Sequence, residues 1–212
     1  MAKSGCIFII LWRGCIRNCI NLAASRSHCG ASPKTGSAIT EIGAVKVCGG
    51  QVIGTFKTFV NPGTPLPPFI TELTGITDEM LIDAPRIESV LPLLFEFLGS
   101  DKSTVFVAHN APFDLSFLRA SAALHGYTWP NFRVIDTVKA ARFVLTKDDV
   151  ANYQLGTLAL YFRTEIAPNH RALDDALAAV QPAAGGADHR LLDLHDAADA
   201  AGRRQGRHEF RQ

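Results

Sequence analysis

The chain has 212 residues, of which 47% are hydrophobic and 19% are charged, and its formal net charge is +1. This balance excludes a disordered chain and a polycation that wraps nucleic acid by charge alone, and the length suits one domain with room for only a small second one. The five cysteines are odd in number and irregularly placed. That pattern argues against the disulfide framework of a secreted protein, so we expect reduced thiols and a cytoplasmic protein.

The first 40 residues differ in charge from the rest of the chain. They contain five basic and no acidic side chains, so the remaining residues carry 16 basic and 20 acidic side chains, a net of −4. Four of the five cysteines also fall before residue 30. We therefore expect residues 1–37 to form an atypical N-terminal segment.

An apolar run over residues 6–12 resembles the core of a minimal signal peptide. Arg13, Arg17 and Asn18 then interrupt it, and it is far shorter than the ~18 residues that span a bilayer. We expect neither a functional signal peptide nor a membrane partner, and the pattern predicts no particular function for residues 6–12.

Residues 38–108 show clear patterns of secondary structure. β-branched residues on either side of Gly49-Gly50 predict two strands joined by a tight turn over 38–60. A proline-rich connection follows, then short helices over 69–83 and a longer helix over 87–98 with one apolar face. The continuous apolar run at 105–108 is typical of a strand buried on both faces.

Helices and strands alternate in the next part of the chain. We expect a helix over 114–124, a strand at 134–135, and helices over 137–145, 154–162 and 170–180. Beyond Pro182 the sequence turns to Ala, Gly, Asp and Arg, so residues 181–212 should form a loosely ordered tail with one short helix near 191–201. The order of elements predicts an α/β fold, in which helices pack on a mixed sheet.

Two polar motifs interrupt this apolar framework. The first, His109-Asn110-Ala111-Pro112-Phe113-Asp114, follows the buried strand at 105–108 and opens a helix, and α/β sheets usually place ligands at the carboxyl ends of their strands. A carboxylate in the first turn also has a purely structural explanation, because it complements the helix dipole.

The second motif is His170-Arg171-Ala172-Leu173-Asp174-Asp175. In a helix, Asp174 and Asp175 lie four and five residues after His170, so an imidazole and two carboxylates crowd one helix end. A solvated helix start explains this motif equally well when it is taken alone.

Together, HNAPFD and NHRALDDA, about sixty residues apart, resemble the DnaQ-like (DEDDh) 3′→5′ exonuclease family, typified by the epsilon subunit of bacterial DNA polymerase III. The resemblance covers residues 38–180 and includes EIGAV at 41–45 and LTGIT at 73–77. Segments 69–83 and 144–158 look closest to the exonuclease domain fused to excinuclease-C-like nucleases. The resemblance implies a ribonuclease-H-like mixed central sheet flanked by helices.

The resemblance also implies a mechanism and its residues. Family members use four carboxylates to hold two divalent ions, Mg²⁺ or Mn²⁺, which activate a water and stabilise the leaving 3′-oxygen. The implied substrate is a single-stranded 3′ end of DNA or RNA, and a DNA polymerase or repair nuclease is the implied partner in replication or repair. By motif match, Asp114 and Asp175 are metal ligands, His170 is the general base, and His109, Asn110, Phe113, Thr74 and Gly75 contact the substrate.

The family's first motif, D-x-E-T-T-G, is missing. If Gly30 marks its glycine, Ser25 to Cys29 replace the rest, and no carboxylate precedes Glu41 in any register. Glu41 itself matches a position that is structural by default. Two carboxylates cannot readily hold two dications, so we predict a severely impaired or inactive nuclease.

The same region should also weaken the fold. The first strand is expected at the centre of the sheet, where residues 16–22 are a poor replacement because polar residues interrupt them. Three interpretations remain open: an exonuclease that uses other ligands or a partner's residues, a non-catalytic nucleic-acid-binding module, and a non-functional remnant. Residues before about 30 and after about 180 would, in the last case, be read out of frame.

Overall fold

The computed structural model describes residues 7–13, 38–48, 51–99, 104–164 and 167–178. Within these residues, one sheet has the strand order β3-β2-β1-β4-β5. β2 runs antiparallel to both of its neighbours, β3 and β1, whereas β1, β4 and β5 run parallel to one another. The strands are β1 (Ile7–Arg13), β2 (Glu41–Cys48), β3 (Gln51–Phe59), β4 (Val105–Ala108) and β5 (Arg133–Asp136).

The central strand corrects one expectation. The sequence predicts that residues 16–22 replace the first strand poorly, but β1 is formed by Ile7–Arg13 and pairs with β2 on one side and β4 on the other. The physical reason is that a strand between two neighbours favours a continuous apolar run, and IFIILW provides one without interruption. The stretch 16–22 itself lies outside the described residues, as do the proposed motif remnant at 25–30 and the tail at 181–212.

Seven helices complete the described part of the chain, and all lie close to the predicted positions. They are α1 (Pro68–Thr74), α2 (Asp78–Leu81), α3 (Ile87–Leu98), α4 (Ala111–Leu124), α5 (Thr137–Val144), α6 (Leu155–Phe162) and α7 (Ala172–Ala178). Helix α4 begins three residues before the predicted start, because Pro112 suits the first positions of a helix. None of these helices is long and apolar enough to cross a membrane.

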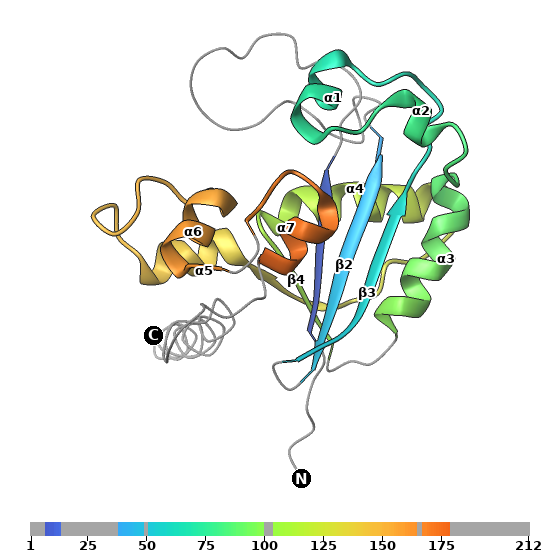
Figure 1. The fold of residues 1–212 in the computed structure, drawn as a ribbon. Helices are drawn as coiled ribbons and strands as arrows, with labels where there is room; N and C mark the ends of the chain where they lie inside the picture. The colour runs from blue at the N-terminus through green and yellow to red at the C-terminus, as the bar shows by residue number, and fades with distance from the viewer. Residues whose placement is uncertain (1–6, 14–37, 49–50, 100–103, 165–166, 179–212) are drawn as a thin grey trace, which may run out of the picture.

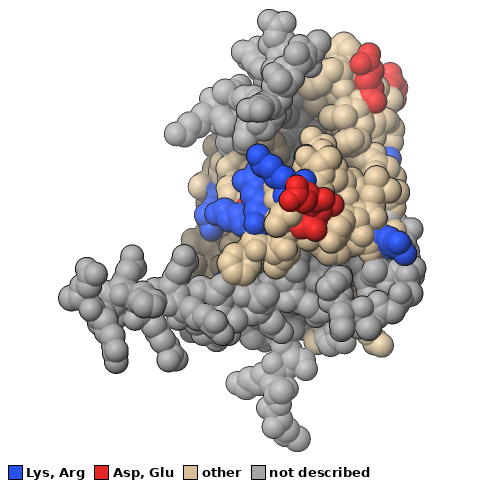
Figure 2. Space-filling model, turned by 90° about the vertical axis from the view of Figure 1, so that its left-hand side faces the viewer, with Lys and Arg blue, Asp and Glu red and all other residues tan. Residues whose placement is uncertain are grey.

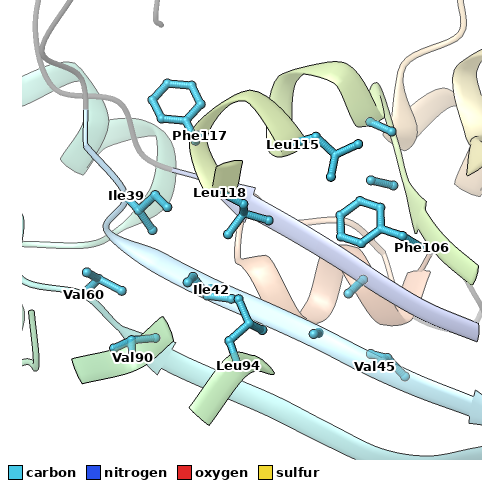
Figure 3. Packing of buried hydrophobic residues seen from close by; sticks show 14 of the residues in the cluster. Ile39, Ile42, Val45, Val60, Val90, Leu94, Phe106, Leu115, Phe117 and Leu118 are labelled. Atoms are coloured by element: carbon cyan, nitrogen blue, oxygen red, sulfur yellow. The ribbon is translucent and has the colours of Figure 1, made fainter. Parts of the chain in front are cut away.

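The main core lies between the sheet and the helices, with Ile42, Phe106, Leu94 and Leu118 fully buried (Figure 3). Figure 1 shows α7 in front of the sheet and α4 behind it. A second, smaller cluster joins α5 and α6 and contains Ala141, Leu145, Val150, Leu158 and Phe162. The mixed sheet flanked by helices confirms the predicted α/β class.

Candidate active site

The segment that joins β4 to α4 is fixed by hydrogen bonds to the start of α5. Asn110 adopts a left-handed backbone conformation, with φ of 69°, and its N–H donates to Asp136 Oδ1 at 3.1 Å. The same oxygen accepts from the Val138 N–H at 3.0 Å and so caps α5. His109 Nδ1 lies 2.9 Å from the buried hydroxyl of Thr137. Asp136 and Thr137 thus hold the HNAPFD segment in place.

Asp114 lies in the first turn of α4 and is only 2% exposed. Its neighbour Phe113 is half-buried and packs against Phe117, with ring centroids 5.2 Å apart. A carboxylate so far removed from water is costly to keep ionised unless donors or cations surround it. Burial therefore argues against a merely solvated helix start at this motif.

Asp175 lies in the first turn of α7 and is fully buried. Its Oδ1 atom accepts hydrogen bonds from the backbone N–H groups of Asn169 at 3.0 Å and His170 at 3.3 Å. His170 itself is exposed and has a φ of 65°. The structure thus brings His170 and Asp175 together: the His170 residue is exposed to solvent, and the Asp175 carboxylate is buried. Asp174 instead accepts from the Asn169 side-chain amide at 2.8 Å.

A buried ion pair anchors the start of α7 to the sheet. Glu41 is fully buried, and Arg171 donates to its carboxylate through Nε, at 3.3 and 3.2 Å, and through Nη2, at 2.8 Å. The Ala172 N–H adds a fourth bond, at 2.9 Å to Oε2. The hydrogen bond to Glu41 raises the pKa of Arg171 above its ordinary value. Glu41 is thus fully engaged in holding α7, in line with its expected structural role.

Gly43 allows α7 to approach β2 closely. A Cβ atom at this position would lie 2.3 Å from the Leu173 nitrogen, a distance that real contacts do not show. Side chains alternate along a strand, so Glu41 and Gly43 share the face on which α7 lies. The EIGAV motif therefore supplies both the anchor and the gap for the helix that carries Asp175.

The two motifs lie at the same edge of the sheet. β1 and β4 run parallel, with Ile9 opposite Val107, so their carboxyl ends lie together. α4 begins three residues after β4. The last residue of β1, Arg13, pairs with Glu41, to which the start of α7 is bound. The first turns of α4 and α7 therefore both lie at the carboxyl ends of the two central parallel strands, as α/β ligand sites do.

The donors that the structure describes do not fit a pair of metal ions. Within the described residues, no group of three or more His, Cys, Asp or Glu side chains is arranged to hold a metal ion. The chain has no carboxylate before Glu41, so β1 supplies none. Oxygen-ligated dications need several anionic oxygens to offset mutual repulsion and lost hydration. Asp114 and Asp175 alone provide half of the carboxylates that the resemblance implies.

Thr74 and Gly75 end α1. The buried Thr74 hydroxyl donates to the Ile70 carbonyl at 2.7 Å and accepts from the Ile76 N–H at 3.2 Å. Gly75 has a φ of 70°, in the left-handed region that favours glycine, and closes the helix. Both residues thus have clear structural roles, and contact with substrate remains a prediction for them, as it does for His109, Asn110 and Phe113.

Sequence reasoning missed four residues that position the site: Arg171, Asp136, Thr137 and Gly43. The N-cap of α5 could have been predicted from the sequence, because an Asp directly before a helical segment is a common N-cap. Arg171 lies inside the second motif, but its partner Glu41 is 130 residues away in the chain. No local pattern shows such a pair.

Comparison with known proteins gives consistent results. A family model described as exonuclease matches residues 29–182. The chain is 53% identical over 143 residues to a putative bifunctional exonuclease/endonuclease protein of Mycobacterium tuberculosis, covering 68% of this chain and 22% of that protein. It is 46% identical over 143 residues to the PolC-type DNA polymerase III of Caldanaerobacter subterraneus, covering 68% of this chain and 10% of the polymerase. The chain thus spans less than a quarter of the length of these two relatives.

Solved structures share the fold. Exonuclease X in complex with 5′-overhanging duplex DNA aligns with a TM-score of 0.60 at 22% identity, over 91% of this chain and 93% of that one. The nuclease domain of 3′hExo, a DEDDh family member bound to rAMP, aligns with a TM-score of 0.64 at 20% identity, over 84% and 88%. The family match, the close relatives and the shared ribonuclease-H-like architecture show that the chain belongs to the DnaQ-like exonuclease family.

Proposed function

We propose that the chain is a 3′→5′ exonuclease domain for single-stranded ends of DNA or RNA, with a severely reduced rate of hydrolysis. The buried carboxylates of Asp114 and Asp175, at the same edge of the sheet as His170, carry this proposal. Imidazole titrates near neutral pH and accepts a proton readily, so an exposed His170 suits the role of general base for an attacking water.

The missing first motif supports the reduced rate. The family match begins at residue 29, beyond β1, and β1 contains no acidic residue. Preorganised charge is usually the largest contribution to lowering the barrier in phosphoryl transfer, so losing two of four carboxylates should cost several orders of magnitude. Mg²⁺ or Mn²⁺ would supply the Lewis acid in a complete site.

A purified-protein assay tests this proposal. Degradation of a 3′-labelled single strand with Mg²⁺ should run several orders of magnitude slower than in an active family enzyme assayed in parallel. Any residual cleavage should disappear in His170→Ala and Asp175→Asn, while Asp174→Asn, a change at the adjacent carboxylate, should retain it. Turnover at the rate of the active enzyme would contradict the reduced rate.

The same donor deficit favours a second candidate, a nucleic-acid-binding module without catalysis. The uninterrupted apolar β1 at the sheet centre supports a folded module rather than a non-functional remnant. Binding of a single strand without any cleavage would select this candidate. For the remnant, translating the neighbouring reading frames of the gene should reveal D-x-E-T-T-G, and its absence there would count against a frameshift.

The relatives also suggest a biological setting. One is named for a DNA polymerase III and another for an exonuclease and an endonuclease. We therefore propose that the domain acts in DNA replication or repair, beside a polymerase or a second nuclease. A pull-down with the purified polymerase or nuclease subunit from the same organism tests this assignment.

A further inference from the structure

A groove lies beside the proposed site, between α4, β5 and the start of α5. Its volume is about 490 Å³, and α4 contributes Pro112 and Arg119, β5 contributes Val134 and Asp136, and α5 contributes Lys139. Pro112 lies in the first turn of α4, the turn that also carries Asp114. The groove is therefore continuous with the helix start at the proposed site.

Two cationic side chains line the groove. Arg119 and Lys139 are both exposed, and in the described part of the chain neither forms an ion pair. On the side of the molecule where α5 and α6 lie, Lys and Arg side chains gather next to Asp and Glu side chains (Figure 2). An Arg and a Lys on one concave wall, without an ion-pair partner among the described residues, suit an anionic ligand.

The acidic member of the wall does not cancel these charges fully. Asp136 Oδ1 already accepts the N–H groups of Asn110 and Val138, and this single carboxylate shares the wall with two cations. Val134 is 38% exposed and adds an apolar contact on the same wall. Cations with an apolar neighbour match a sugar–phosphate chain better than a free inorganic anion.

The first turn of α4 connects the groove to the site. Arg119 follows Asp114 by five residues, so it lies about 7.5 Å further along the helix and about 140° around it, on a different face. Pro112, in the same first turn as Asp114, lines the groove. A strand that passes over Pro112 from a terminal phosphodiester at Asp114 would therefore bring its next phosphates into the groove. We propose that the groove between α4 and α5 binds the phosphodiester backbone of the substrate strand, 5′ of the terminal nucleotide, through Arg119 and Lys139. This inference rests on the proposed function.

Salt-dependent binding tests the proposal without requiring catalysis. The probe is a short oligothymidylate labelled at its 5′ end, with binding followed by fluorescence anisotropy in EDTA over a range of salt concentrations. Each phosphate contact to a single strand contributes about 0.7 to the slope of log K against log salt. Arg119→Gln with Lys139→Gln should therefore lower the slope by about 1.4 and weaken binding about 25-fold at about 0.1 M salt.

A matched pair controls for loss of net charge. Lys57→Gln with Lys147→Gln removes two exposed cations outside the groove, one on β3 and one in the loop after α5. This control should leave the slope and the affinity nearly unchanged, and circular dichroism checks that both double variants remain folded. If the groove variant fails to fold, the single variants Arg119→Gln and Lys139→Gln should each lower the slope by about 0.7.

Two results would overturn the proposal. Equal slopes for the groove variant and the control would show that the cations do not contact the strand, although the chain binds it. Displacement of the probe by polyglutamate as readily as by unlabelled oligothymidylate would show a site for acidic chains in general. Absence of any binding by the unmodified chain would instead contradict the proposed function itself, so the two failures are distinguishable.

Discussion

Replacing Arg171 by Met tests whether the Glu41–Arg171 pair anchors α7. The variant keeps the length of the side chain but leaves the Glu41 carboxylate, fully buried, with only the Ala172 N–H as a described donor. Breaking a buried pair by removing one partner costs about 3–5 kcal/mol. Arg171 is 24% exposed, so water can partly replace it and we expect the lower end, about 3 kcal/mol.

Urea unfolding followed by circular dichroism measures this loss, which at an m-value of about 1–3 kcal/mol/M corresponds to a midpoint shift of about 1–3 M. Arg142→Met is the matched control, because Arg142 is exposed and lies 5.5 Å from the centre of the Tyr153 ring. Loss of that cation–π contact should cost at most about 1 kcal/mol. The raised pKa of Arg171 means that its contribution is fully present at every pH below the ordinary arginine value, so the result should not change between weakly acidic and neutral pH.

A double variant separates the pair from other effects. Glu41→Gln keeps an oxygen for the Ala172 N–H but removes the buried charge, so Glu41→Gln with Arg171→Met should be more stable than Arg171→Met alone by at least about 1 kcal/mol. A loss below about 1 kcal/mol in Arg171→Met, or no recovery in the double variant, would refute the reasoning that this pair fixes the helix.

Two further predictions concern α7 packing and pH. Gly43→Ala should displace α7, because its Cβ would lie 2.3 Å from the Leu173 nitrogen, and the free energy of unfolding should fall by about 1–3 kcal/mol. The control Gly156→Ala, in α6 with open space around its Cβ, should be neutral or stabilising by up to about 1 kcal/mol. Equal melting temperatures for the two variants would contradict this difference. Hydrogen bonds from the Thr146 N–H and hydroxyl lower the pKa of the exposed Asp149. Its carboxylate therefore stabilises the fold above the ordinary aspartate pKa, and this contribution is lost as pH falls through the lowered value. Asp149→Asn should flatten this part of the curve of stability against pH, and an unchanged curve would contradict the role of the two Thr146 hydrogen bonds.

The fold could be predicted from local patterns wherever one segment sufficed. The two strands around Gly49-Gly50, the buried strand at 105–108 and the helices that follow have apolar periodicities that fix their type. The central strand could not be predicted in the same way. The apolar run at 6–12 suits a strand, a buried helix or a signal sequence, and only its pairing with β2 and β4 decides between them.

The candidate site, too, could be predicted only where a local motif carries the information. The types and order of Asp114, His170 and Asp175 follow from two short motifs, and the first-turn positions follow from the helix starts. Burial of the two carboxylates and the anchor through Glu41 depend on contacts between residues far apart in sequence. Such contacts are properties of the folded chain, and no window of the sequence contains them.

Titration with Mn²⁺ by calorimetry tests the central claim most directly, since it reports how many ions the site binds. The proposed site has Asp114 and Asp175 as two of the four carboxylates that the family uses. We therefore predict at most one weakly bound ion per chain, and no binding after Asp114→Asn with Asp175→Asn. Two tightly bound ions per chain, lost in that double variant, would contradict the account.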